Sequence, residues 1–176
     1  MTTTQRPDEL VSILSSDFQR ALGFVIIEDR KTSGTSGGTF TSGAWRTRTL
    51  NTTVLNTLEN DYSLAANQFT LAKGVYWILA SAPGFVVERH ATRLQNITDG
   101  TTVASGTSEF TNDNSPVSVS NRSIVNTFFV LSSSKTLELQ HRCQTTKASD
   151  GFGLSMGGSF AVTNEVYAQV MICKIG

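Results

Sequence analysis

The chain has 176 residues and a formal net charge of zero, with 14 basic and 14 acidic side chains. This length suits one well-buried domain, and the balanced charge argues against binding nucleic acid through its phosphates, which needs a basic excess. No apolar run reaches the length of a membrane span, so we expect no membrane insertion. About a quarter of the residues are Ser or Thr, a composition typical of strands and loops rather than helices.

The first expected element is a short amphipathic helix within an N-terminal arm, residues 1–23. Pro7 suits the first helical position, and Gly23 ends the helix. The apolar residues that follow Pro7 recur at spacings of three and four, which places them on one helix face. They are Leu10, Ile13, Leu14 and Phe18. Such a stripe must be buried, either on the base of the domain or on an assembly neighbour.

The sequence pattern of residues 24–176 predicts a series of strands separated by turn residues. The expected strands are 24–29, 44–50, 68–71, 75–81, 85–95, 101–108, 117–131, 135–143 and 164–176. The Lys73-Gly74 turn indicates a hairpin between two of them. We expect residues 51–62 to be irregular, with Val54, Leu55 and Leu58 dipping into the core. This spacing predicts an all-β antiparallel sandwich of the jelly-roll type rather than a βαβ protein.

The last strand, 164–176, has apolar residues on both of its faces. Alternate positions place four apolar residues on each face. One face has Val166, Ala168, Val170 and Ile172, and the other has Tyr167, Met171, Cys173 and Ile175. A strand exposed on one side alternates apolar with polar residues, so this strand is predicted to be covered on both sides. A second copy of the same chain is the simplest second cover. The pattern therefore predicts an oligomer.

No stretch of the sequence supports catalysis or a cofactor. The run from Gly153 to Gly157 matches the nucleophile motif G-x-S-x-G, but no histidine follows Ser155 and no helix is expected after it. A flexible Gly/Ser loop is the favoured interpretation. The Gly34–Gly38 loop lacks the Lys-Ser/Thr pair of a phosphate-binding loop. We therefore expect neither an enzyme nor a bound nucleotide.

His90, His141 and Cys143 are the candidate soft metal ligands. A metal needs three or four converging ligands, and hydrogen-bonded histidines within or between subunits are the favoured interpretation. A ring of identical side chains on an oligomer axis stays an alternative. Cys143 and Cys173 are too few for a disulfide framework and are expected to be buried reduced thiols, which indicates assembly in a reducing cytoplasm.

Charged residues alternate with apolar ones along several expected strands. They are Arg46, Arg48, Glu88, Arg89, Arg93, Glu138 and Arg142. We expect most of them on the solvated or subunit-facing side of the sandwich, where ion pairs between subunits would set register more than strength.

Several separate blocks of the sequence resemble a family. They are GTSGGTFTSGAWRTRTLNT, LAKGVYWILASAPGFVVERHATRLQNITDGT, SEF, LELQHRC and EVYAQVMICKIG. Together, in this order, they resemble tailed-phage virion proteins whose domain is similar to the trimeric jelly roll of the tumour necrosis factor and complement globular-head superfamily. The resemblance covers Phe24 to Gly176 and implies a homotrimer displayed on a virus particle.

This resemblance implies a capsid decoration or cement protein that bridges neighbouring capsomers, with the major capsid protein as its partner. It would be assembled in the host cytoplasm and would lie on the capsid exterior of the virion. The short run of about twenty residues before the first strand favours this role over that of a fibre tip. The residues assigned to the trimer interface are Tyr76, Trp77, Phe128, Phe129, Tyr167, Met171, Cys173 and Ile175. Those assigned to the capsid anchor are Arg6, Pro7, Leu10, Ile13, Leu14 and Phe18.

The alternative function is a receptor-binding tip module of a tail or head fibre. It would recognise a host surface glycan or protein through apical loops, including Gly34–Gly43 and Thr111–Pro116. We do not favour a hydrolase that acts on surface polysaccharide, because the sequence shows no paired carboxylates of the kind that such chemistry needs.

Overall fold

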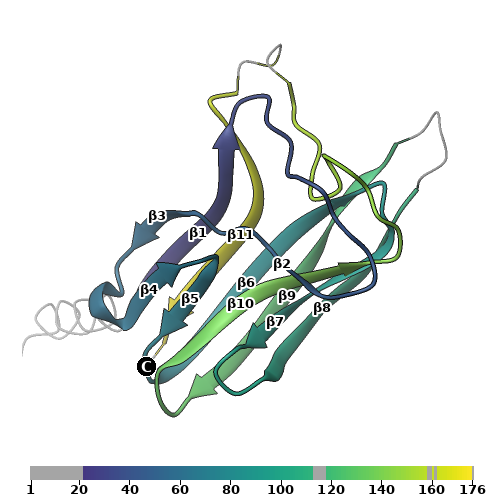
Figure 1. Ribbon diagram of the computed structural model, residues 1–176. Helices are drawn as coiled ribbons and strands as arrows, with labels where there is room; N and C mark the ends of the chain where they lie inside the picture. The colour runs from purple at the N-terminus through teal and green to yellow at the C-terminus, as the bar shows by residue number, and fades with distance from the viewer. Residues whose placement is uncertain (1–21, 113–117, 158–159, 161, 176) are drawn as a thin grey trace, which may run out of the picture.

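The structure is a computed structural model that describes residues 22–112, 118–157, 160 and 162–175. These residues form a sandwich of two antiparallel sheets (Figure 1), which confirms the predicted all-β class. The expected arm helix and the anchor residues from Arg6 to Phe18 lie outside the described residues.

One layer is a five-stranded sheet with the order β3-β1-β11-β6-β9. Its strands are β1 (Gly23–Thr32), β3 (Thr52–Asn56), β6 (Gly74–Phe85), β9 (Ser120–Leu131) and β11 (Asn164–Lys174). The last strand of the chain is the central one, because β11 pairs with β1 on one side and with β6 on the other.

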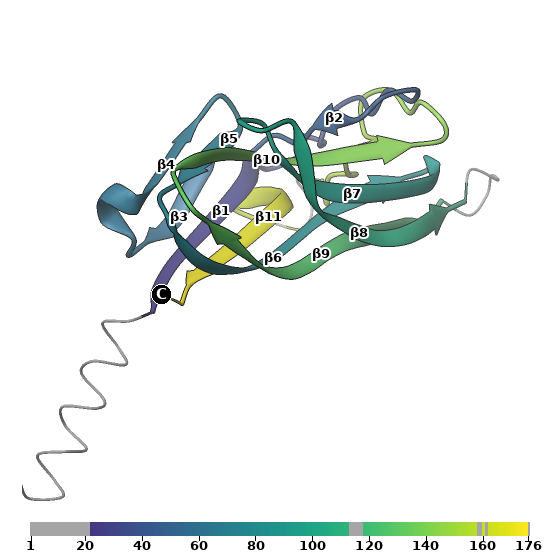
Figure 2. The same cartoon turned by 90° about the horizontal axis from the view of Figure 1, so that it is seen from below.

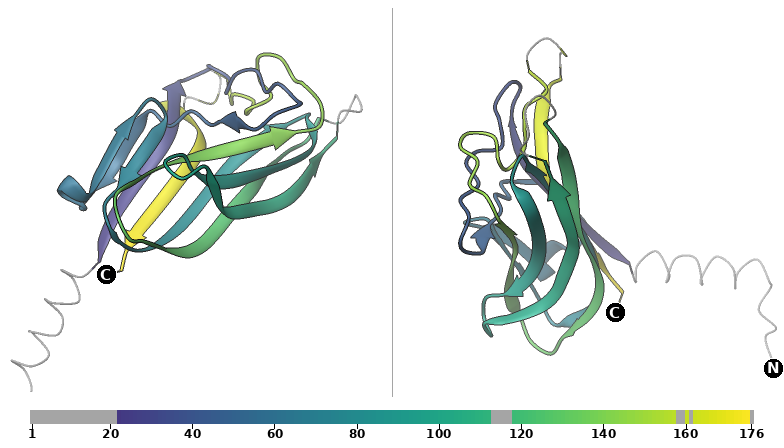
Figure 3. Two further views of the ribbon diagram at one scale, coloured as in Figure 1. Left: turned by 60° about the horizontal axis from the view of Figure 1, so that its bottom comes forward. Right: turned by 90° about the vertical axis from the view of Figure 1, so that its right-hand side faces the viewer.

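The other layer has the strand order β4-β5-β10-β7-β8, with β2 paired to β10 as well. Its strands are β2 (Arg46–Thr47), β4 (Tyr62–Ala65), β5 (Gln68–Leu71), β7 (Glu88–Asn96), β8 (Thr101–Thr111) and β10 (Lys135–Cys143). A 3-10 turn, Glu59–Asp61, precedes β4. Figure 2 and the right-hand view of Figure 3 show the two layers from below and from the side.

The main core fills the space between the two sheets. Each strand contributes every second residue, because successive side chains point to opposite faces. Fully buried members include Tyr76, Ile78, Leu137, Leu139, Ala168, Val170 and Ile172. Burying a large apolar side chain stabilises a fold by roughly 1.5–3 kcal/mol, so these rows hold the layers together. A smaller cluster of Phe40, Val87 and Cys143, with Phe152 against it, lies apart from this core.

Some expected elements differ from those observed. The predicted hairpin around Lys73-Gly74 is wrong, because β5 and β6 belong to different sheets. The chain crosses between the layers at this turn, and a local turn signal does not distinguish a crossover from a hairpin. Residues 51–62 contain β3, where Val54 and Leu55 are 47% and 40% exposed rather than buried. Leu58 is buried as predicted.

A β-bulge changes the facing of β11 part-way along the strand. Glu28 pairs with Gln169 but Arg30 pairs with Val166, so one residue of β1, Asp29, lies opposite two residues of β11. A bulge of this kind shifts the alternation by one residue. As a result Val166 is exposed, whereas Ala168 and the residues after it keep the inward positions. The single alternation predicted along this strand therefore holds only after the bulge.

Candidate interaction surface

The outer side of the five-stranded sheet carries an apolar surface that the described residues leave partly exposed. Trp77 lies between Cys173 and Phe128 in one cross-strand row, and Val75 lies beside Val130 in the next. We call this surface the outer apolar face, and define it by Val75, Trp77, Leu79, Phe128, Val130, Met171 and Cys173. Phe128 is 68% exposed and Val130 is 72% exposed. Contiguous exposed apolar residues of this kind mark interaction sites.

The predicted trimer-interface residues divide between this face and the interior. Trp77, Phe128, Met171 and Cys173 lie on the outer apolar face, and Ile175, which follows β11, is 40% exposed. The predictions for Tyr76 and Phe129 are corrected, because adjacent residues of a strand point to opposite sides.

Tyr76 and Phe129 point into the sandwich instead. Tyr76 is completely buried, and its ring stacks on that of Phe129 with the ring centroids 5.7 Å apart. The Tyr76 hydroxyl donates a hydrogen bond to the carbonyl of Ala72 over 2.9 Å.

Tyr167 also lies inside its own chain, which corrects its assignment to a surface between subunits. It is 4% exposed, and its hydroxyl donates to the carbonyl of Thr35 at 2.8 Å. A Cβ atom on Gly153, whose φ is +140°, would lie 2.2 Å from the Tyr167 ring. The bulge at Asp29 turns Tyr167 inward, where it holds two loops against the end of the sheet.

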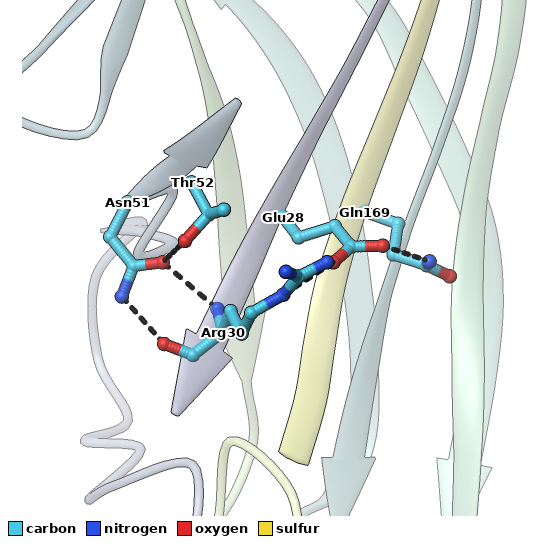
Figure 4. A network of polar contacts seen from close by, with 5 residues as sticks. All are labelled: Glu28, Arg30, Asn51, Thr52 and Gln169. Atoms are coloured by element: carbon cyan, nitrogen blue, oxygen red, sulfur yellow. Dashed lines mark hydrogen bonds and ion pairs between the residues drawn. The ribbon is translucent and has the colours of Figure 1, made fainter. Parts of the chain in front are cut away.

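The outer apolar face ends in a polar network (Figure 4). The carboxylate of Glu28 accepts hydrogen bonds from the Arg30 guanidinium at 2.7 Å and from the Gln169 amide at 3.0 Å. Asn51 binds the backbone of Arg30, accepting from its N–H at 2.9 Å and donating to its carbonyl at 2.8 Å. Glu28 is 7% exposed. A polar end of this kind fixes the register of an interface more than its strength.

His90 and His141 form a buried hydrogen-bonded pair, as one of the two interpretations of the sequence predicted. The Nδ1 atom of His90 lies 2.9 Å from Nε2 of His141, and Nε2 of His90 lies 2.7 Å from Oδ1 of Asn121. Because Oδ1 of Asn121 only accepts, His90 carries its proton on Nε2 and accepts at Nδ1. His141 then donates from Nε2, which leaves its buried Nδ1 as an acceptor without a hydrogen-bond partner among the described residues.

The environment of the two histidines disfavours their charged forms. Burial lowers the pKa of His90, although Asn121 and Glu109 act in the opposite direction. Burial, with the nearby Arg48 and His90, lowers the pKa of His141 well below its ordinary value. Both rings are therefore neutral at pH 7. In the part of the chain that the structure describes, no group of three or more His, Cys, Asp or Glu side chains is placed to hold a metal.

Arg48 is the charged residue whose position differs most from expectation. It is fully buried, whereas the alternating pattern of charged residues placed it on the outside. Its guanidinium donates to the carbonyls of Phe152 at 2.9 Å and Pro83 at 3.3 Å and lies over the Phe152 ring, 4.0 Å from the centroid. Burial lowers the pKa of Arg48 to about 9, while the carboxylate of Asp29 acts to raise it. Arg48 thus joins the loop that contains Phe152 to β6 at Pro83.

Glu138 is likewise buried, at 4% exposed. It accepts hydrogen bonds from Thr47 at 3.1 Å and Gln68 at 2.9 Å, so it ties β2 and β5 to β10. Arg89 and Arg142 are exposed and Arg93 is partly exposed, as expected.

The two end glycines of the Gly153–Gly157 loop adopt backbone conformations that other residues rarely adopt. Both glycines have positive φ, at +140° and +77°, where other residues are strained. The Ser155 amide donates to the Ser36 hydroxyl at 3.4 Å. The glycines thus shape a turn that joins two loops. Cys143 and Cys173 are both free and buried, and burial raises the pKa of Cys143 to about 11.

Comparison with known proteins gives matches among solved structures. The globular domain of zebrafish complement 1qA matches with a TM-score of 0.52 and 16% identity, over 88% of this chain and 96% of that one. Eiger TNF from S. frugiperda matches with a TM-score of 0.55 and 11% identity, over 88% and 93%. Murine APRIL at pH 5.0 matches with a TM-score of 0.54 and 8% identity, over 87% and 98%.

The fold is the jelly roll of the tumour necrosis factor and complement globular-head proteins. No family model matches the sequence, and no curated protein matches it either. At these identities the likeness concerns the fold. Among the described residues, this jelly roll contains no helix long and apolar enough to cross a membrane.

Proposed function

We propose that the protein is a homotrimer assembled through the outer apolar face. The observation that carries this proposal is the exposure of Phe128 and Val130, at 68% and 72%, beside Trp77 in the five-stranded sheet. Removing apolar area from water contributes about 25 cal/mol for each Å², from which the entropic costs of association are subtracted. The similarity of the fold to tumour necrosis factor and complement globular heads supports a closed assembly of this kind.

The trimer serves as a virion structural protein that decorates the capsid of a tailed phage and cements neighbouring capsomers. The support for this role is the resemblance of the sequence blocks between Phe24 and Gly176 to phage virion proteins. Its partner is the major capsid protein, on the exterior of the shell. Three arms linked in one trimer bind at high effective concentration, so modest single contacts add to a tight attachment. A protein that binds only the assembled shell stabilises it by mass action.

The oligomeric state tests the first part of this proposal. Light scattering on the purified full-length protein should give a mass three times that of the chain, and Phe128→Glu should dissociate it by placing a charge in an apolar contact. The matched control is Ile97→Glu, because Ile97 is 38% exposed in the turn that follows β7, in the other sheet. A wild-type monomer, or a Phe128→Glu variant that stays trimeric, would contradict the assigned interface.

The second candidate function is recognition of the host surface by the apical loops. Most of the expected Thr111–Pro116 loop lies outside the described residues. The observation that favours this function is that two other loops, 33–45 and 144–157, are held together by hydrogen bonds at the end of the sandwich away from the C-terminus in Figure 1. Gly37 donates to the carbonyl of Gly153 at 2.8 Å, and Phe40 and Lys147 exchange two bonds at 2.9 and 3.0 Å. A preformed surface binds with less loss of entropy than a loose one. Co-sedimentation of the protein with host cells, compared with capsids that lack it, separates the two functions.

A further inference from the structure

A pocket opens on the six-stranded sheet, where the loop before β2 meets the ends of β7, β8 and β10. Its volume is about 1020 Å³, at the upper end of the range for small-molecule sites. Arg142, Ala91 and Ser108 are cross-strand neighbours in one row, with Arg89 and Phe110 in the next. The short side chains of Ala91 and Ser108 leave a hollow between larger neighbours. The pocket is on the other sheet from the outer apolar face, so the proposed trimer contact does not use these residues.

Two aromatic side chains line this hollow. The ring of Trp45 is held by the Arg93 guanidinium, which stacks on it 4.3 Å from the centroid. Arg93 is fixed in turn by its bond to Gln140 at 2.7 Å. Phe110 lines the pocket as well and is 54% exposed. Exposed aromatic rings offer flat apolar surfaces on which the C–H face of a sugar ring packs.

The pocket also carries two guanidinium groups that form no ion pair with the described residues. Arg142 is exposed, and its guanidinium takes part in no ion pair or hydrogen bond with the described residues. Arg89 donates to the amide oxygen of Gln144 at 2.8 Å and forms no ion pair with any described residue. Glu109 is the acidic residue of the lining, and it accepts a bond from Asn121 at 3.2 Å. A guanidinium matches the planar geometry of a carboxylate and also binds sulfate and phosphate oxygens.

We propose that this pocket binds an anionic saccharide, with its acidic group on Arg142 and Arg89 and a sugar ring against Trp45. The acidic group is a carboxylate or a sulfate ester. This inference rests on the second candidate function, for which it names a site and a ligand class, and it is independent of capsid attachment. Aromatic rings and unpaired guanidinium groups in one hollow suit a charged sugar better than an apolar ligand, because an apolar ligand would leave the cations desolvated and unpaired.

The test uses the full-length protein on an array of sialylated, uronate-containing, sulfated and neutral saccharides, with acidic peptides beside them. Calorimetry then measures the affinity for the acidic saccharide that binds most tightly. Arg142→Gln should weaken binding about tenfold or more, the effect of losing one charge-assisted contact. Trp45→Ala should weaken binding by a similar factor, because it removes the apolar surface under the sugar ring. The matched control is Lys73→Gln, which removes a positive charge from the exposed turn between β5 and β6. Light scattering checks that each variant keeps the wild-type assembly.

The expected result is binding to acidic saccharides, weakened by the two pocket variants and unchanged by Lys73→Gln. The sialylated, uronate and sulfated arms identify which acidic group is preferred. The proposal is overturned if no acidic saccharide binds, if neutral saccharides or acidic peptides bind as well, or if Arg142→Gln binds like the wild type. Cell binding without saccharide binding would overturn the pocket while leaving host recognition intact. Saccharide binding without cell binding would support the pocket and contradict host recognition.

Discussion

At the scale of single residues, the apical half of the sandwich is unusual in burying polar and charged groups. His90, His141 and Arg48 are at most 4% exposed, and Asp29 is buried near Arg48. The Nε atom of Arg48 and Nδ1 of His141 have no hydrogen-bond partner among the described residues. Unpaired buried polar atoms cost free energy, so the packing and the hydrogen bonds of the surrounding groups must offset this cost.

The histidine pair predicts a loss of stability in mild acid. Both folded-state pKa values lie below the unfolded value of about 6.5. Stability is therefore constant above that pH and falls as the pH decreases below it, because the unfolded chain takes up protons that the folded chain refuses. Each histidine contributes up to about 1.4 kcal/mol of loss between pH 7.5 and 5.5. Urea unfolding at several pH values measures the effect.

The matched variant for this prediction is His141→Gln. A glutamine amide can still donate toward Nδ1 of His90, but it does not titrate. Between pH 7.5 and 5.5 the variant should lose less free energy of unfolding than the wild type. The difference should be up to about 1.4 kcal/mol, the contribution of one histidine. Because other titrating groups are common to both proteins, the difference isolates this site. Parallel pH profiles for the two proteins would show that the pair does not limit stability in acid.

At the scale of elements, Glu165 joins β11 to the two loops that contain Gly34 and Met156. It is 4% exposed, and its carboxylate accepts from the amides of Gly34 at 3.0 Å and Met156 at 3.2 Å. Glu165→Ala should lower the free energy of unfolding by about 1–2 kcal/mol. Amide exchange should accelerate at Gly34 and Met156, because their hydrogen-bond acceptor is gone. Exchange at Leu139, in the core strand β10, should stay slow until global unfolding.

Glu165→Gln is the control for the loop prediction, since its carbonyl oxygen still accepts one of the two bonds. Only one of the two loop amides should then lose its protection. Exchange at Gly34 and Met156 that stays at the wild-type rate in Glu165→Ala would mean that other contacts position these loops.

The sequence identifies elements better than it identifies their neighbours. Strict alternation gave 135–143 with the bounds of β10, because this strand is regular along its length. No local sequence pattern indicates the bulge opposite Asp29. Because of this bulge, Tyr167 points into the sandwich rather than to its outer side. The assignment of Val54 to the core failed because β3 is an edge strand, which among the described strands pairs only with β1.

At the scale of the whole molecule, the jelly-roll class was predictable and the surfaces were only partly so. The alternation of strands and turns, with the resemblance, indicates two antiparallel layers. Both faces of β11 were correctly predicted to be apolar after the bulge, which located the outer apolar face.

The pocket of Trp45, Phe110 and Arg142 was missed, because these residues are distant in sequence and only the register of β7, β8 and β10 brings them together. The sequence does not show which of the adjacent residues Tyr76 and Trp77 faces the core, and only the position of β6 in the sheet decides it.

The last prediction concerns how the whole assembly is attached. Deletion of residues 1–22 should leave a folded trimer, because the main core and the outer apolar face belong to residues 23–175. The truncated trimer should no longer co-sediment with capsids that lack the protein, since the proposed anchor residues, from Arg6 to Phe18, are removed. Full-length Phe128→Glu is the informative companion, because it keeps the arm but loses the trimer. A single arm should bind about 10²–10⁴-fold more weakly than three linked arms. If the truncated trimer still saturates the capsids, the contact belongs to the jelly roll itself, and the arm is not the anchor.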